Sequence, residues 1–210
     1  MNTGFQAIDC EHESPDLKKM KAYREKLIEI GKRGAHNAAS ALSEMLFEEV
    51  TLDVSDVHIL PPQQVQNIYD TPDQATLGIY MELSGESSCD FLLAFEESEG
   101  REIAAVMSME DSPENLEPDV VGEALTELGN IVIGSFINAI ADSLSVKLIP
   151  TPPNLTMDFF DSIIDRFLIK QSINTDLSII FVTTFKRMGK TVNGALIVFA
   201  GKEFLNNIPS

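Results

Sequence analysis

The chain carries the same helix-like pattern twice, at a constant offset of 98 residues. In the second copy, Glu127 and Asn130 stand three residues apart within an apolar run, and Glu123 precedes them by one helical turn. On a helix these three side chains share one face. The first copy keeps Glu29 where the second has Glu127, but has Lys32 where the second has Asn130. A repeat of this length in two copies indicates a duplicated half-domain and not a solenoid.

The second helical segment has two distinct faces. The polar stripe continues from Asn130 to Gly134, Asn138 and Asp142. The opposite face predicts a core contact through Leu125, Leu128, Val132, Phe136, Ala139 and Ile140. A carboxylate beside a carboxamide on a rigid face can pair with a partner's cation and position a water. The alternative is an ordinary solvated helix face.

The remaining pattern predicts strands after each helix. In each half a long helix precedes about three strands, and the strand runs are bounded by turn and proline signals. We expect an α+β fold with a duplicated half-domain, its helices lying on one side of a mainly antiparallel sheet. The predicted organisation is a flexible tail at 1–16, a first half at 17–110, a linker at 111–118 and a second half at 119–210. The two halves are expected to form one fused domain.

Composition narrows the function classes. The 210 residues carry a net charge of −18, which argues against nucleic-acid binding because phosphate neutralisation needs a basic surface. We see no apolar run of membrane-span length and no secretory signal, so we expect no membrane contact. Cys10 and Cys89 show no disulfide framework, which favours a reducing cytoplasm.

Positive charge is concentrated at the first helix. Seven of the 15 basic residues lie there: Lys18, Lys19, Lys21, Arg24, Lys26, Lys32 and Arg33. The cluster is either a docking surface for an acidic partner or a solvated face.

No other chemistry is indicated by the sequence. His12, His36 and His58 lack metal-ligand spacing, and no glycine-rich nucleotide motif occurs, so no cofactor and no metal site of the chain's own are expected. Glu123 and Glu127 form a carboxylate pair one turn apart, for which repulsion and solvation are the simpler interpretation.

With these features in view, the chain resembles the CheC, CheX and FliY family of chemotaxis phosphatases, and CheC in particular. The family pattern is an Asp or Ser, then a Glu, an Asn three residues later and a downstream proline. Glu127 and Asn130 match, Pro153 falls at the family's distance, and Glu123 departs from the first position. The resemblance spans roughly residues 17–206. In the first copy Lys32 replaces the asparagine and Ser55 stands at the proline position.

The resemblance implies hydrolysis of the aspartyl phosphate of a CheY-type response regulator. In the family, the asparagine orients the attacking water and the glutamate pairs with a lysine of the regulator, which also holds Mg²⁺. These roles would fall to Asn130 and Glu127, while Gly129 and Gly134 would let the partner's backbone approach. For both glycines the alternative is packing within the chain, favoured for Gly134.

A first surface with Glu29 and Lys32 is expected to be inactive, because an ammonium donates but cannot accept a hydrogen bond. Two alternatives remain for the whole chain. One is a non-catalytic binding module, with CheD or a flagellar switch component as partner. The other is a phosphatase of a different response regulator.

Overall fold

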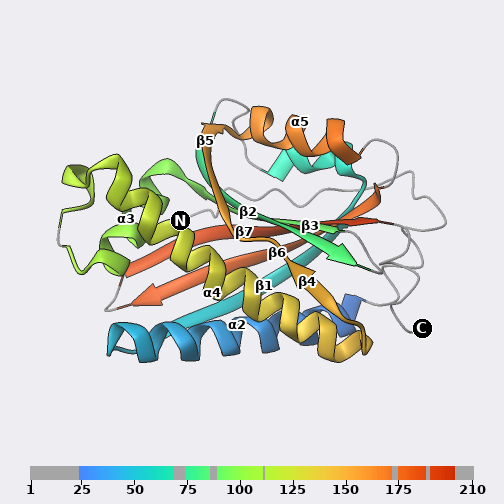
Figure 1. Ribbon diagram of the computed structural model, residues 1–210, viewed down its shortest axis with the longest axis horizontal. Helices are drawn as coiled ribbons and strands as arrows, with labels where there is room; N and C mark the ends of the chain where they lie inside the picture. Colours follow the sequence, from blue (N-terminus) through green and yellow to red (C-terminus); the bar gives the residue numbers. More distant parts are fainter. Residues whose placement is uncertain are drawn as a thin grey trace.

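In the part of the chain that the computed structural model describes, a seven-stranded antiparallel sheet carries two long helices side by side on one face (Figure 1). The structure describes residues 24–68, 74–85, 89–110, 112–171, 175–187 and 190–201. The first half comprises α2 (Arg24–Leu46), β1 (Val50–Leu60), the 3-10 helix η1 (Pro62–Ile68), β2 (Ala75–Gly85), β3 (Cys89–Glu96) and α3 (Glu97–Ser108). After η2 (Pro113–Asn115) the second half comprises α4 (Pro118–Leu144), β4 (Leu148–Pro150), β5 (Asn154–Phe159), α5 (Phe160–Gln171), β6 (Thr175–Arg187) and β7 (Lys190–Gly201).

The strands of the two halves are interleaved in the sheet. The order is β1-β6-β7-β3-β2-β4, with β5 also paired to β2, and every pairing is antiparallel. Strands of one half therefore lie next to strands of the other at both edges and at the centre. Each strand of the first half has an equivalent in the second half: β1 corresponds to β4 and β5, β2 to β6, and β3 to β7. If each strand is replaced by its equivalent, the strand order stays the same but runs in the opposite direction, so the two halves are related by an approximate twofold axis. The predicted α+β fold with a duplicated half-domain is confirmed.

The first core lies between the sheet and the two long helices. All six predicted core residues of α4 are buried, with at most 4% of their surface exposed. The aromatic ring of Phe136 in α4 packs edge-on against that of Phe181 in β6, with centroids 5.4 Å apart. Gly34 of α2 lies against Phe136, where a Cβ atom would come within 2.9 Å of the ring. The two helices cross at this point because one of them has no side chain there.

A second core covers the opposite face of the sheet, so the prediction of helices on one side only was wrong. Figure 1 shows α5 over that face, away from α2 and α4. Phe167 of α5 stacks on Phe199 of β7 with ring centroids 5.0 Å apart. The central strands carry apolar residues on both faces, as in β3, where every residue from Cys89 to Phe95 is buried. A sheet buried on both faces requires a cover on both.

Helix α4 differs from prediction in its start and in its apolar length. It begins at Pro118, one residue before the predicted start of the second half, with Glu117 as its N-cap residue, because proline fits the first helical position. By length and composition α4 is also long and apolar enough to cross a membrane. However, 56% of its apolar window is buried inside the protein, as expected for a core helix. The predicted tail, Cys10, His12 and the lysines at 18, 19 and 21 lie outside the described residues.

Candidate functional site

The polar face of α4 is the candidate site. Glu123, Glu127 and Asn130 are exposed, as are Asn138 and Asp142 further along, and we call these five residues the α4 stripe. Leu128, Gly129 and Val132 on the other side of the helix are buried. This anchoring holds the backbone beneath the stripe in place.

Glu127 and Asn130 are available to a partner. Neither side chain has a hydrogen bond or an ion pair with any residue that the structure describes. An exposed amide offers both donors and an acceptor, and an exposed carboxylate offers only acceptors. Together they can hold a water molecule and receive a cation, and both come from a rigid, well-packed helix.

The two glycines of the motif have opposite surroundings. A Cβ atom at Gly129 would lie 2.2 Å from Cγ2 of Ile79 in β2, so this glycine lets α4 lie close to the sheet. A Cβ atom at Gly134 would meet nothing within 4 Å. The preference for packing at Gly134 was therefore wrong. Gly134 leaves an open notch in the α4 stripe, and Gly129 is the packing glycine.

Pro153 lies at the sheet edge on the side of the second half. It stands between β4 and β5, which pair with different parts of β2. The crossing segment is fixed where the backbone N–H of Thr151 donates to the carbonyl oxygen of Glu82 at 2.8 Å. Proline here interrupts an edge strand that is continuous in the first half.

The corresponding residues of the first half lie on α2. Glu29 and Lys32 are exposed, and Ser55 forms a bulge in β1 between Val54 and Asp56. Strand β1 continues through this bulge, whereas the equivalent strand of the second half is interrupted at Pro153. The Ser55 hydroxyl therefore donates to the carbonyl oxygen of Val182 in the neighbouring strand β6, at 3.3 Å.

The basic cluster on α2 is partly neutralised within the chain. Arg24 pairs with Asp56 and also donates to the carbonyl oxygen of Val57 at 3.2 Å. Arg33 donates to the Ser143 hydroxyl at the C-terminal end of α4. Lys32 is exposed and forms no ion pair with any residue in the described ranges.

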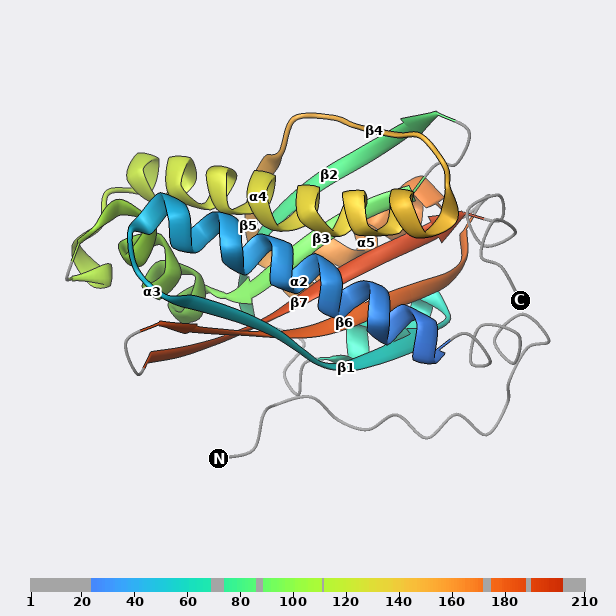
Figure 2. The ribbon, with the colours of Figure 1, turned by 90° about the horizontal axis from the view of Figure 1, so that it is seen from below.

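The two motifs occupy separate surfaces. Figure 2 shows α2 and α4 running side by side, with the N-terminal end of each next to the C-terminal end of the other. The contact of Arg33 with Ser143 places the first motif beside the C-terminal half of α4. Contact with Glu127 and Asn130 therefore does not require contact with Glu29 or Lys32.

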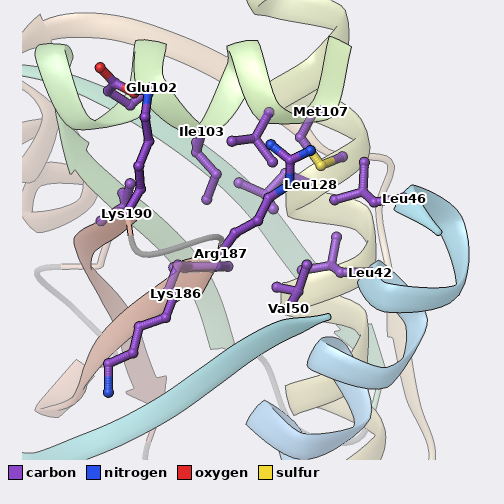
Figure 3. A pocket seen from close by; sticks show the side chains of 13 residues that line it. Leu42, Leu46, Val50, Glu102, Ile103, Met107, Leu128, Lys186, Arg187 and Lys190 are labelled. Carbon is purple, nitrogen blue, oxygen red and sulfur yellow. Dashed lines mark hydrogen bonds and ion pairs between the residues drawn. The ribbon is translucent and has the colours of Figure 1, made fainter. Parts of the chain in front are cut away.

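An apolar pocket lies where the C-terminal end of α2 meets α3 and α4, and it was not foreseen from the sequence. Figure 3 shows its wall of aliphatic side chains from α2, α3 and α4, including Leu42, Ile103 and Leu128. Its charged rim is paired within the chain, with Arg187 to Glu48 and Lys190 to Glu102, each at 2.7 Å. Leu128 projects from the buried side of α4, so this pocket does not include Asn130. The pocket forms where α3 packs against the two long helices, a contact between segments far apart in the sequence.

Outside the α4 stripe, the pKa values of Cys89 and Glu99 are shifted. Burial, with Asp90 as a secondary cause, raises the pKa of the Cys89 thiol. Partial burial raises the pKa of Glu99, opposed by the backbone N–H of Asn193, which donates to it at 3.1 Å. Within the described ranges, no three His, Cys, Asp or Glu side chains gather as a metal-binding group.

Comparison with known proteins places this stripe within a family segment. A profile of the CheC-like family matches residues 121–157, which include Glu123, Glu127, Asn130 and Pro153. The CheY-P phosphatase CheC of Bacillus subtilis (strain 168) is 28% identical over 149 residues, covering 70% of this chain and 71% of that protein. The predicted resemblance to the CheC family is confirmed.

Solved structures support the fold. FliY of Thermotoga maritima is similar with a TM-score of 0.71 and 15% identity, covering 93% of this chain and 95% of that one. A chain of the FliM–SpeE complex of H. pylori is similar with a TM-score of 0.66 and 12% identity, covering 90% and 95%. At such identities the likeness concerns the fold alone.

Proposed function

We propose that the protein accelerates hydrolysis of the aspartyl phosphate of a CheY-type chemotaxis response regulator. The observation that carries the proposal is the exposed, unengaged pair Glu127 and Asn130 on a buried helix, within the segment matched by the CheC-like family. The name of the B. subtilis relative supports the same activity.

In this proposal Asn130 positions the nucleophile. The regulator supplies the acyl phosphate, Mg²⁺ and a lysine that balance the charge on the phosphoryl group. The Asn130 amide accepts a hydrogen bond from a water molecule and orients its oxygen for in-line attack on phosphorus. The bond between phosphorus and the aspartyl oxygen then breaks, which yields inorganic phosphate and a free carboxylate. Catalysis by positioning of this kind resembles the water-orienting glutamine of GTPases.

Glu127 has a docking role in the same scheme. Its carboxylate accepts hydrogen bonds from the regulator's lysine ammonium, which fixes the register of the two proteins. Gly134, with no side chain and open space around it, leaves room for the partner one turn beyond Asn130. Gly129 has no part in docking because it is covered by Ile79.

The test is the Asn130→Ala variant, assayed by the decay of phosphorylated regulator. We expect the stimulated rate to fall by about 100-fold or more, the usual effect of losing one group that acts in the transition state. Asn138→Ala is the matched control, since it removes an exposed amide two turns along the α4 stripe. If Asn130→Ala retains full stimulation, Asn130 does not orient the water.

A non-catalytic role is the second candidate, favoured by the likeness to a chain of the FliM–SpeE complex. In that case the α4 stripe would bind a chemotaxis or flagellar switch protein, or CheD, without hydrolysis. Binding of phosphorylated regulator without any faster decay, in a panel of regulators from the same organism, would favour this role. Faster decay of another regulator only would favour the third possibility, a different substrate.

A further inference from the structure

The edge strand β1 and helix α2 form a groove that is separate from the α4 stripe. It is lined by Lys32, Ala35, His36, Ala39, Ser40 and Ser43 from α2 and by Val50 to Val54 of β1. The groove has a volume of about 530 Å³ and is open to solvent. Figure 2 shows β1 at the edge of the sheet with α2 alongside it. We call this feature the β1 groove.

Part of the free edge of β1 is already capped by the chain itself. The backbone N–H of Val50 donates to the Ser43 hydroxyl at 2.9 Å. Seven residues on, the N–H of Val57 donates to the Asp56 carboxylate and its carbonyl oxygen accepts from Arg24. These contacts show which backbone groups point away from β6.

Two residues between the caps, Leu52 and Val54, have buried side chains but no partner for their outward backbone groups among the described residues. Strand geometry has a period of two, so the N–H and C=O groups of Leu52 and Val54 point to the same side as those of Val50. The bulge at Ser55 then moves the outward position to Val57. No side chain or loop among the described residues bonds to the outward groups of Leu52 or Val54. The open window therefore holds two donors and two acceptors.

The second half closes the equivalent window. At the offset of 98 residues, Leu52 corresponds to Pro150 and Val54 to Pro152. Proline has no N–H, so neither position can donate to an added strand. Native sheets commonly protect their edges in this way. The first half has the same scaffold without that protection.

The charge of the β1 groove selects its occupant. Lys32 lines the groove and has no ion pair with the described residues, whereas Arg33 is directed to Ser143 of α4 and does not line the groove. Asp53 is the one acidic residue among those lining the groove, and it pairs with Lys186 at 3.4 Å. The unbalanced charge is the ammonium of Lys32, which lies towards Val54 because α2 and β1 run in opposite directions. Small side chains at Ala35 and Ala39 leave room beside it.

We propose that the β1 groove binds a short extended peptide segment with a carboxylate, which pairs as an added strand with Leu52 and Val54 and places its carboxylate at Lys32. Strand addition of this kind takes affinity from backbone hydrogen bonds and specificity from alternate side chains. An antiparallel peptide would place an apolar residue opposite Leu52, beside Ala39, and an acidic residue opposite Val54. The site is independent of the phosphatase site, since Lys32 and Asn130 lie on separate surfaces.

The probe is the blocked peptide acetyl-Thr-Asp-Thr-Val-Thr-amide, added to the full chain while amide hydrogen exchange is followed residue by residue. We expect exchange at Leu52 and Val54 to slow at least tenfold, with little change at the capped amides of Val50 and Val57. The same peptide methylated on the amide nitrogens of its Asp and Val should have no effect, because it cannot donate to β1. Lys32→Gln should weaken binding several-fold, whereas Lys26→Gln, on the same helix outside the groove, should not.

Each other result overturns the proposal. Unchanged exchange up to about 1 mM peptide means that the edge does not accept a strand. Equal protection by the methylated peptide means that binding does not use the edge. Protection of Leu52 and Val54 without peptide, rising with protein concentration, means that a second copy of this chain occupies the groove. Binding should be retained in Asn130→Ala, so failure here and failure of the proposed phosphatase activity are separable.

Discussion

The two long helices of this protein share one scaffold and differ in what they present to solvent. Both keep a glycine against the sheet: a Cβ atom at Gly31 would lie 2.7 Å from the ring of Phe181, and one at Gly129 would lie 2.2 Å from Ile79. On the exposed side, Asn130 in α4 corresponds to Lys32 in α2, and Pro153 to Ser55. The buried half of the repeat has been retained because it positions the helices. The exposed half has diverged, which gives each surface its own chemistry.

The largest effect on stability that we predict tests the shared scaffold. Gly129→Ala should lower the free energy of unfolding by about 1–3 kcal/mol, because its methyl group would overlap Ile79, a β-branched side chain with little freedom to move. Gly31→Ala should destabilise in the same direction, because its methyl group would overlap the buried ring of Phe181. Gly134→Ala is the control and should stabilise the protein by roughly 0.5–1 kcal/mol, since alanine has higher helix propensity and the space is empty. Urea unfolding measures all three, and equal effects at Gly129 and Gly134 would contradict the packing described here.

The contrast between these glycines also shows what the sequence could and could not predict. Helical periodicity predicted the buried face of α4 correctly, because a core contact needs apolar residues at fixed spacing. A glycine carries no such signal. Whether its missing side chain serves a neighbouring strand or an open surface depends on Ile79, which lies 50 residues earlier in the chain.

Strand prediction had the same limit. The runs that form β1, β2 and β3 were evident from the turn and proline residues that bound them, but the interleaved order of the sheet was not. The second core on the far face was missed because apolar residues of a doubly buried strand do not alternate, as in β3. The β1 groove could not be foreseen either, since it depends on Ser43 and Arg24 capping a strand edge from α2. The exposure of Glu127 and Asn130, by contrast, follows directly from their place opposite the apolar face.

A smaller effect is expected from the acidic residues of the two motifs. Glu127→Ala should raise the KM for phosphorylated regulator about tenfold or more and leave kcat nearly unchanged, because an intermolecular ion pair contributes to the encounter and not to the chemical step. Glu29→Ala is the matched variant on α2 and should leave both constants unchanged. Steady-state kinetics with saturating regulator separates the two parameters. A fall in kcat that persists at saturation would contradict a docking role for Glu127.

The smallest effect is expected when the first surface is converted towards the second. Combining Lys32→Asn with Asn130→Ala places Glu-x-x-Asn on α2, with Glu29 as its carboxylate, and removes the amide of α4. We expect the rate to stay within a few-fold of unaided decay, because Ser55 leaves β1 continuous where the second half has Pro153. Arg24 and Arg33 also keep cationic groups along the same helix. Decay of phosphorylated regulator measures the outcome, and Lys32→Asn alone shows whether the change disturbs the α4 stripe. Hydrolysis restored to the level of the unmodified protein would show that a single side chain separates the two surfaces, and that the strand edge has no part in the difference.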